Sequence, residues 1–206
     1  MSYDDSKMFQ MNQFAAKRRG LQGPIDDAFT DAFICVRGTG EPWSQPLQSW
    51  SEWTLKRFES EFDKWLRGRV PVVDDQKLSE SDIASKNLIL FGDPGSNKVL
   101  KQILPKLPVE WSEDKITVHG QTWSTADHGL VMIFPNPLNT RRYVVLNSGH
   151  TFHEKDFRAS NSWLFPRLGD VAVVKFEADG DSYHESTAWA EIFNSGWRLP
   201  PAKAKQ

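Results

Sequence analysis

Three continuous runs of apolar residues predict the strands of a buried sheet. They cover residues 32–36, 87–91 and 143–147, and none of them alternates between apolar and polar positions. A strand covered by helices on both faces has this pattern, which is typical of parallel sheets. We therefore expect these three segments to form the centre of one sheet.

Amphipathic patterns between the runs predict helices. One starts at residue 44 or 51 and ends at residue 66, and a shorter one is expected over residues 79–85. Another follows the second apolar run, with its cap either at Asp93 or later, at Ser96 or Asn97. This order of strands and helices predicts a parallel sheet with right-handed crossovers.

The second half of the chain has a different pattern. His119-Gly120 is a two-residue hairpin signal between two short strands. A strand over residues 130–134 is expected to end at the prolines that follow it, and residues 171–176 and 187–193 suit an antiparallel hairpin at the sheet edge. The expected fold is α/β: a three-layer, mostly parallel doubly wound sheet with an antiparallel C-terminal hairpin extension.

Local composition divides the chain into three predicted segments. Residues 1–31 are polar and contain a glycine-bearing stretch, so they are expected to form an N-terminal extension or connector. Residues 32–198 form the α/β domain, and residues 199–206 form a C-terminal tail. A connector at the start predicts that another region precedes this chain in a longer protein.

The overall composition excludes several classes of protein. The 206 residues carry a net charge of −2, which gives no electrostatic footprint for nucleic acid. No apolar stretch is long enough for a membrane span, and the single cysteine, Cys35, excludes a disulfide framework. The first residues contain no hydrophobic signal core. The sequence as written predicts a cytoplasmic protein, or an exported one if a signal-bearing region precedes it.

Each of the three apolar runs is followed by a small polar loop. The carboxyl ends of neighbouring parallel strands share one sheet edge, where ligands bind in open α/β folds. We therefore expect a crevice that accepts a small polar or anionic ligand at free backbone donors, without a metal or cofactor. Its expected binding residues are Gly38, Thr39, Gly92, Gly95, Ser96, Asn97, Asn147, Ser148 and His150.

Catalysis by the last of these loops is a separate hypothesis. Ser148 and His150 are close in sequence, but Ser148 lacks the Gly-x-Ser-x-Gly turn that exposes a nucleophile. His150, His153 and Asp156 have a spacing compatible with metal, but no dense cluster of further ligands accompanies them. The residues themselves therefore favour no catalytic assignment and no metal site.

Four strings carry a resemblance to a known class of proteins. They are GLQGPIDDAF (20–29), NLILFGDPGSN (87–97), VVLNSGHTF (144–152) and PRLGD (166–170). Together they resemble the C-terminal module of large bacterial hydrolases that have a prolyl-oligopeptidase-like or esterase-like α/β-hydrolase region upstream. The resemblance covers about residues 20–198, and it implies that the catalytic serine lies in the upstream region.

The expected function follows from that resemblance and from the predicted crevice. The chain is expected to be a non-catalytic accessory or binding module of a bacterial serine hydrolase or peptidase, with an upstream α/β-hydrolase domain as its partner. The alternative is a stand-alone esterase-like or peptidase-like hydrolase that uses Ser148 and His150.

Overall fold

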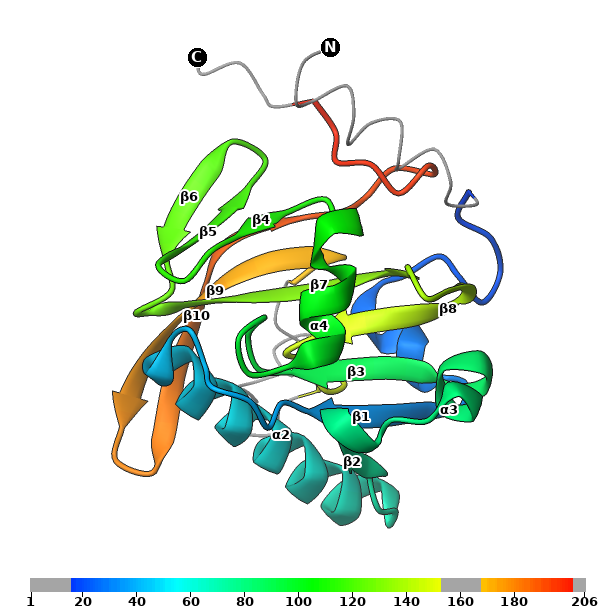
Figure 1. The fold of residues 1–206 in the computed structure, drawn as a ribbon, viewed down its shortest axis with the longest axis horizontal. Coiled ribbons are helices and arrows are strands. Elements are labelled where there is room, and N and C mark those ends of the chain that lie inside the picture. Colours follow the sequence, from blue (N-terminus) through cyan, green and yellow to red (C-terminus); the bar gives the residue numbers. More distant parts are fainter. Residues whose placement is uncertain (1–15, 153–167, 202–206) are drawn as a thin grey trace, which may run out of the picture.

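A mixed sheet of seven strands forms the main body of the molecule (Figure 1). The computed structural model describes residues 16–152 and 168–201. The strands are β1 (Phe33–Arg37), β2 (Val72–Asp74), β3 (Asn87–Phe91), β7 (His128–Asn136), β8 (Asn139–Leu146), β9 (Val171–Asp179) and β10 (Ser182–Glu191). They lie in the order β10-β9-β7-β8-β3-β1-β2.

The two halves of this sheet differ in strand direction. From β8 through β3 and β1 to β2, each pair of neighbours is parallel. From β8 through β7 and β9 to β10, each pair is antiparallel. The strands predicted from the three apolar runs are β1, β3 and β8, and they are adjacent, parallel and buried, as expected.

The longest helix, α2 (Gln45–Leu66), packs against this sheet. Trp50 anchors it because its ring stacks on Phe176 of β9, with the ring centroids 5.2 Å apart. The Trp50 indole N–H also donates to Glu185 of β10 at 2.8 Å. The apolar face of α2 continues to its last residues, where Trp65 is 48% exposed and Leu66 is 61% exposed.

Short helices fill the remaining connections. The two α-helices among them are capped by side chains: Ser79 caps α3 with a capping box, and Asn97 caps α4, which is the later of the two predicted starts. The short helices are α3 (Glu80–Ser85), α4 (Lys98–Ile103) and the 3₁₀ turns η1 (Ile25–Phe29), η2 (Asp75–Lys77) and η3 (Leu104–Lys106).

A second sheet of three antiparallel strands contains β4 (Glu110–Trp111), β5 (Lys115–Val118) and β6 (Gln121–Ser124). The predicted hairpin at His119-Gly120 is confirmed, and both residues have the positive φ angles, 52° and 73°, that such a turn needs. Trp123 of β6 contacts Trp189 of β10, with the ring centroids 6.0 Å apart. This contact joins the small sheet to the large one.

The segment before β1 contributes to the same core. Leu21, Ile25 and Ala28 are fully buried, although residues 1–31 were expected to be a connector outside the domain. The Tyr143 hydroxyl of β8 accepts from the Gly23 N–H at 3.0 Å and donates to Asp27. Burial, together with the hydrogen bond to Asp27, raises the pKa of Tyr143 above its ordinary value. η1 is therefore held firmly against the sheet.

The prediction of a three-layer, mostly parallel doubly wound fold is wrong. Three of the six neighbouring strand pairs in the large sheet are antiparallel, and a separate three-stranded antiparallel sheet accompanies it. Only one long helix is present among the described residues, so paired helical layers do not cover this sheet.

Pro135 explains much of that error. The sequence predicted that the strand over residues 130–134 would end there, yet β7 continues and pairs Pro135 with Tyr143 of β8. The register shifts directly after Pro135. Proline lacks the N–H that a regular ladder needs, so an irregularity is where a strand tolerates it. β7 and β8 therefore form a hairpin that makes half of the sheet antiparallel.

Candidate functional site

The three predicted loops meet at the carboxyl edge of β1, β3 and β8. The Gly38 N–H donates to the Phe91 carbonyl at 3.0 Å, and the Asn147 N–H donates to the Leu90 carbonyl at 2.8 Å. We call these three loops, residues 38–40, 92–97 and 147–150, the carboxyl-edge cluster. The shared edge expected from the sequence is confirmed.

The backbone donors of the second loop, residues 92–97, are already bonded within the protein. The Asp93 carboxylate accepts from the N–H groups of Ser44, Gly95 and Ser96, each at 2.9 Å. Asp93 is fully buried. Its carboxylate therefore occupies the position that we predicted for a bound anion, and the donors expected to be free after Phe91 are used by the fold.

Asn147 joins the third loop to the second. Its side-chain oxygen accepts from the Ser51 hydroxyl at 2.7 Å and from the Gly92 N–H at 2.9 Å, and its amide nitrogen donates to the Gly92 carbonyl at 3.1 Å. The residue adopts a left-handed conformation with φ 47°. This conformation directs the Asn147 side chain to a position where it bridges β3 and α2.

Gly38 and Gly95 are packed closely against neighbouring residues. A Cβ atom at Gly38 would lie 2.9 Å from the Ser96 backbone, and one at Gly95 would lie 2.7 Å from the Glu41 carbonyl. Asn97 is fully buried, with its side-chain amide donating to the Val36 carbonyl at 3.1 Å. These predicted binding residues hold the loops together where they touch.

A groove adjoins the first two loops of the cluster. Its volume is about 440 Å³, and it is lined by Gly40, Asp75, Gln76, Gly95, Ser96, Lys98 and Lys101. Asp75 is itself bonded: it accepts from the Thr39 hydroxyl at 2.7 Å and from the Lys98 N–H at 2.8 Å. Two of the predicted site residues, Gly95 and Ser96, therefore line this groove.

Ser148 and His150 have different surroundings. Ser148 is buried, with 5% of its surface exposed. Its hydroxyl donates to the carbonyl of Gly149 at 2.8 Å. The His150 ring lies edge-on to Phe58 of α2, with the ring centroids 5.1 Å apart. The other two residues considered for a metal site, His153 and Asp156, lie outside the described residues.

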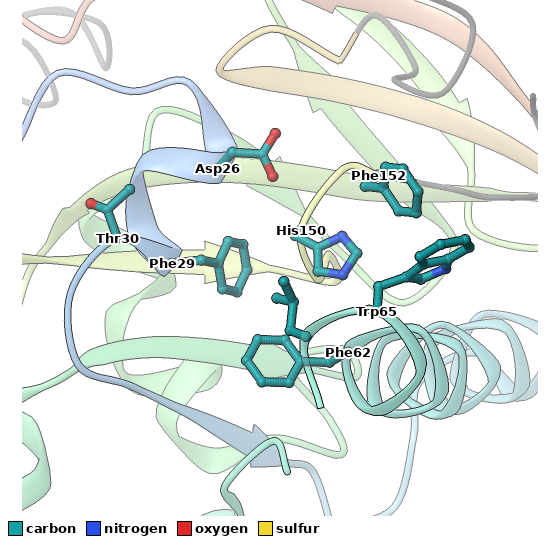
Figure 2. Close-up of a pocket in the computed structure, with 8 residues that line it drawn as sticks. Asp26, Phe29, Thr30, Phe62, Trp65, His150 and Phe152 are labelled. Atoms are coloured by element: carbon teal, nitrogen blue, oxygen red, sulfur yellow. The ribbon is translucent and has the colours of Figure 1, made fainter. Parts of the chain in front are cut away.

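His150 instead lines an apolar pocket of about 420 Å³ between η1, the end of α2 and the loop after β8. Figure 2 shows its aromatic side chains arranged around a common space. We call it the aromatic pocket, and it is lined by Asp26, Phe29, Thr30, Phe62, Trp65, Leu66, His150 and Phe152.

Edge-to-face contacts fix the rings of the pocket. Trp65 and Phe152 pack at 73° with their centroids 5.7 Å apart, and His150 lies 6.0 Å from Phe152. Behind this layer, Phe29 packs edge-on against Phe58 with the ring centroids 5.2 Å apart. Aromatic pairs prefer this geometry, so the rings form a preformed wall.

Asp26 provides the acidic group of the pocket. Its carboxylate accepts from the Thr151 N–H at 2.7 Å and also from the Thr151 hydroxyl. Figure 2 shows this carboxylate at the edge of the pocket, pointing toward the loop that carries His150. The two bonds tie η1 to the loop after β8 and hold the opposite walls together.

The sequence contained part of the signal for this pocket. Phe62 and Trp65 extend the apolar face of α2 beyond the part that the sheet covers. Phe29 and Phe152 are isolated aromatic residues in loops, and their meeting depends on how η1 and the loop after β8 fold back onto α2. Periodicity within one segment cannot predict that meeting.

The other candidate residues have structural surroundings. Burial raises the pKa of the Cys35 thiol well above its ordinary value, and the nearby Glu59 adds to the rise. His128 contacts Asp127, its neighbour in the sequence, at 2.7 Å. Within residues 16–152 and 168–201, no group of three or more His, Cys, Asp or Glu residues could hold a metal ion.

No family model, curated protein or solved structure matches the chain. In the part of the chain that the structure describes, no helix is long and apolar enough to cross a membrane. The function must therefore be inferred from the site itself and from the resemblance seen in the sequence.

Proposed function

We propose that this chain is a non-catalytic binding module associated with a bacterial serine hydrolase or peptidase, and that its ligand binds in the aromatic pocket. One observation carries the proposal: four aromatic rings and an imidazole line a preformed space of about 420 Å³ that reaches the surface beside Trp65 and Leu66. Binding sites for small molecules are concave and mostly apolar, with a few polar groups that fix orientation.

The exposed apolar rim favours occupation of this pocket. Trp65 and Leu66 are among the few large apolar side chains in the described residues that remain well exposed. Removing apolar surface from water contributes about 25 cal/mol per Å². A ligand that covers these two side chains gains this energy, while the backbone donors of the loop after Phe91 are already bonded within the protein.

The resemblance supports the association with a hydrolase. Two of the strings that carry it, 20–29 and 144–152, supply Asp26, Phe29, His150 and Phe152, which are four of the eight pocket residues. Two of the four resembling strings therefore contribute half of the residues that line the pocket. A coding region for an α/β-hydrolase directly upstream of this sequence would support the association.

The alternative is a stand-alone hydrolase that uses Ser148 and His150. The buried hydroxyl of Ser148, which donates to a backbone carbonyl, does not favour it. We expect a fluorophosphonate probe to leave Ser148 unlabelled in the folded protein. Labelling at Ser148, with ester turnover that is lost in Ser148→Ala, would establish the enzyme and refute the proposal.

Fluorine NMR of protein that carries 5-fluorotryptophan tests binding in the pocket. We expect 3,3-dimethyl-1-butanol, a neutral apolar probe, to shift the signal that Trp65→Leu removes. The signal of Trp123, which lies in the small sheet, serves as the control and should not shift. If the Trp65 signal does not respond, or if the Trp123 signal responds equally, the pocket is not the binding site.

A further inference from the structure

We propose that the aromatic pocket recognises an organic cation, an alkylammonium group that lies against the rings and beside Asp26. This inference rests on the proposed function and adds the chemical class of the ligand. The sequence suggested an anionic ligand at the backbone donors after Phe91, but the Asp93 carboxylate already occupies these donors. The ligand inferred for the aromatic pocket has the opposite charge.

The rings supply the first part of the recognition. The face of an aromatic ring is electron-rich and attracts a cation within about 6 Å of the centroid, most strongly when the ring is that of tryptophan. The pocket gathers Phe29, Phe62, Trp65 and Phe152 around one space. The Trp65 ring already makes such a contact, since the Lys64 ammonium lies 5.2 Å from its centroid.

Asp26 supplies the second part. Among the described residues that line the pocket, it is the only acidic side chain, and none of them is a lysine or an arginine. Its two bonds come from neutral donors of Thr151, which orient the carboxylate and do not cancel its charge. A cation in the pocket therefore meets a fixed negative charge, whereas an anion would be repelled by it.

The apolar lining selects a particular kind of cation. A primary ammonium group in water is strongly hydrated, and burying it among rings costs the hydrogen bonds that the pocket cannot replace. A quaternary or alkylated ammonium group carries its charge on methyl groups and loses less hydration. Aromatic recognition sites bind such groups for this reason.

Titration calorimetry with two probes of the same shape tests the inference on the unmodified protein. Choline carries a trimethylammonium group, and 3,3-dimethyl-1-butanol replaces it with a neutral tert-butyl group. We expect choline to bind about tenfold more tightly than the neutral probe, since a desolvated cation–π contact and a carboxylate have that order of effect. Equal affinity, or tighter binding of the neutral probe, would overturn the inference and leave the proposed pocket in place.

Asp26→Asn gives a second measurement, with circular dichroism as a check on folding. The variant keeps an oxygen that accepts from Thr151, and it removes the charge. We expect the ratio of choline affinity to neutral-probe affinity to fall, because only the cation–π contacts with the rings remain to favour choline. The affinity for the neutral probe should not change. An undiminished preference would refute the role of Asp26. If neither probe binds the unmodified protein, the proposed function fails together with the inference.

Discussion

Buried polar residues at the carboxyl edge of the sheet satisfy backbone groups that would otherwise lose their bonds to water. Asp93 and Asn147 together accept four backbone N–H groups and one hydroxyl. The sequence suggested a binding role for Asn147 and a helix cap for Asp93. The sequence could not reveal their partners, because Ser44, Ser51 and Gly92 reach them only through the arrangement of three separate segments.

Asp93→Ala should therefore destabilise the protein strongly. The substitution leaves the N–H groups of Ser44, Gly95 and Ser96 without their acceptor, and each buried orphan group costs about 1–3 kcal/mol. We expect a loss of about 3 kcal/mol or more in the free energy of unfolding, measured with urea. The exposed Asp181, replaced by alanine, is the control and should change stability by less than about 0.5 kcal/mol. A similar effect of both substitutions would contradict the structural role of Asp93.

Asp82 is expected to titrate at unusually low pH. Hydrogen bonds from Lys86 and then from Ser79 lower the pKa of this carboxyl to about 2. Because its folded pKa lies below its unfolded value, the stability it contributes is present above about pH 4 and is lost as the pH falls toward 2. Carbon-13 NMR of the Asp82 carboxyl should show it still ionised at about pH 3, and Lys86→Met should raise its pKa. Titration near pH 4 in the unmodified protein would show that the α3 capping box does not hold the charge.

At the scale of the elements, α2 connects the carboxyl-edge cluster to the aromatic pocket. Its first turns carry Ser51, which bonds to Asn147 at the carboxyl edge, and Trp50, which packs on β7, β9 and β10. Its last turns carry Phe62 and Trp65 in the aromatic pocket. The helix is therefore fixed along its first half and presents an apolar surface at its end.

Gly129→Ala tests this anchoring. A Cβ atom at Gly129 of β7 would lie 2.2 Å from the Trp50 ring, so the indole and α2 must move. We expect a loss of about 1–3 kcal/mol in the free energy of unfolding, in the range of overpacked cores. In Gly196→Ala, the added atom would meet only Asn194, at 3.4 Å, and this variant is the matched control. Equal stability of the two variants would mean that Trp50 does not anchor α2.

Prediction from the sequence succeeded for single elements and failed where distant elements pair. The apolar runs predicted β1, β3 and β8, and side-chain chemistry predicted the start of α3 and the hairpin at His119-Gly120. The pairing of β7 with β8 was missed because Pro135 is tolerated at a shift in register. That pairing decides whether the sheet is mostly parallel or mixed, so one local exception changed the fold class.

At the scale of the whole molecule, the fold brings three distant segments of the chain together around one pocket. Asp26 and Phe29 come from η1, Trp65 comes from the end of α2, and Phe152 follows β8. The bond from Thr151 to Asp26 and the bond from Tyr143 to Asp27 hold these segments in place. The pocket is therefore a property of the tertiary fold, and only its separate apolar residues could be recognised in the sequence.

Trp65→Leu should separate binding from stability. Trp65 is 48% exposed, so we expect the free energy of unfolding to change by less than about 0.5 kcal/mol. Losing the indole ring should nevertheless weaken choline binding severalfold, because tryptophan gives the strongest cation–π contact. Trp123→Leu is the control for loss of a tryptophan elsewhere. Unchanged choline affinity in Trp65→Leu would place the ligand away from this ring.

A crystal structure of the protein with choline tests the central claim most directly. The account predicts the trimethylammonium group among Phe29, Phe62, Trp65 and Phe152, with its charge beside the Asp26 carboxylate. Choline bound in the groove beside Lys98, or an aromatic pocket filled by other side chains of the protein, would contradict it.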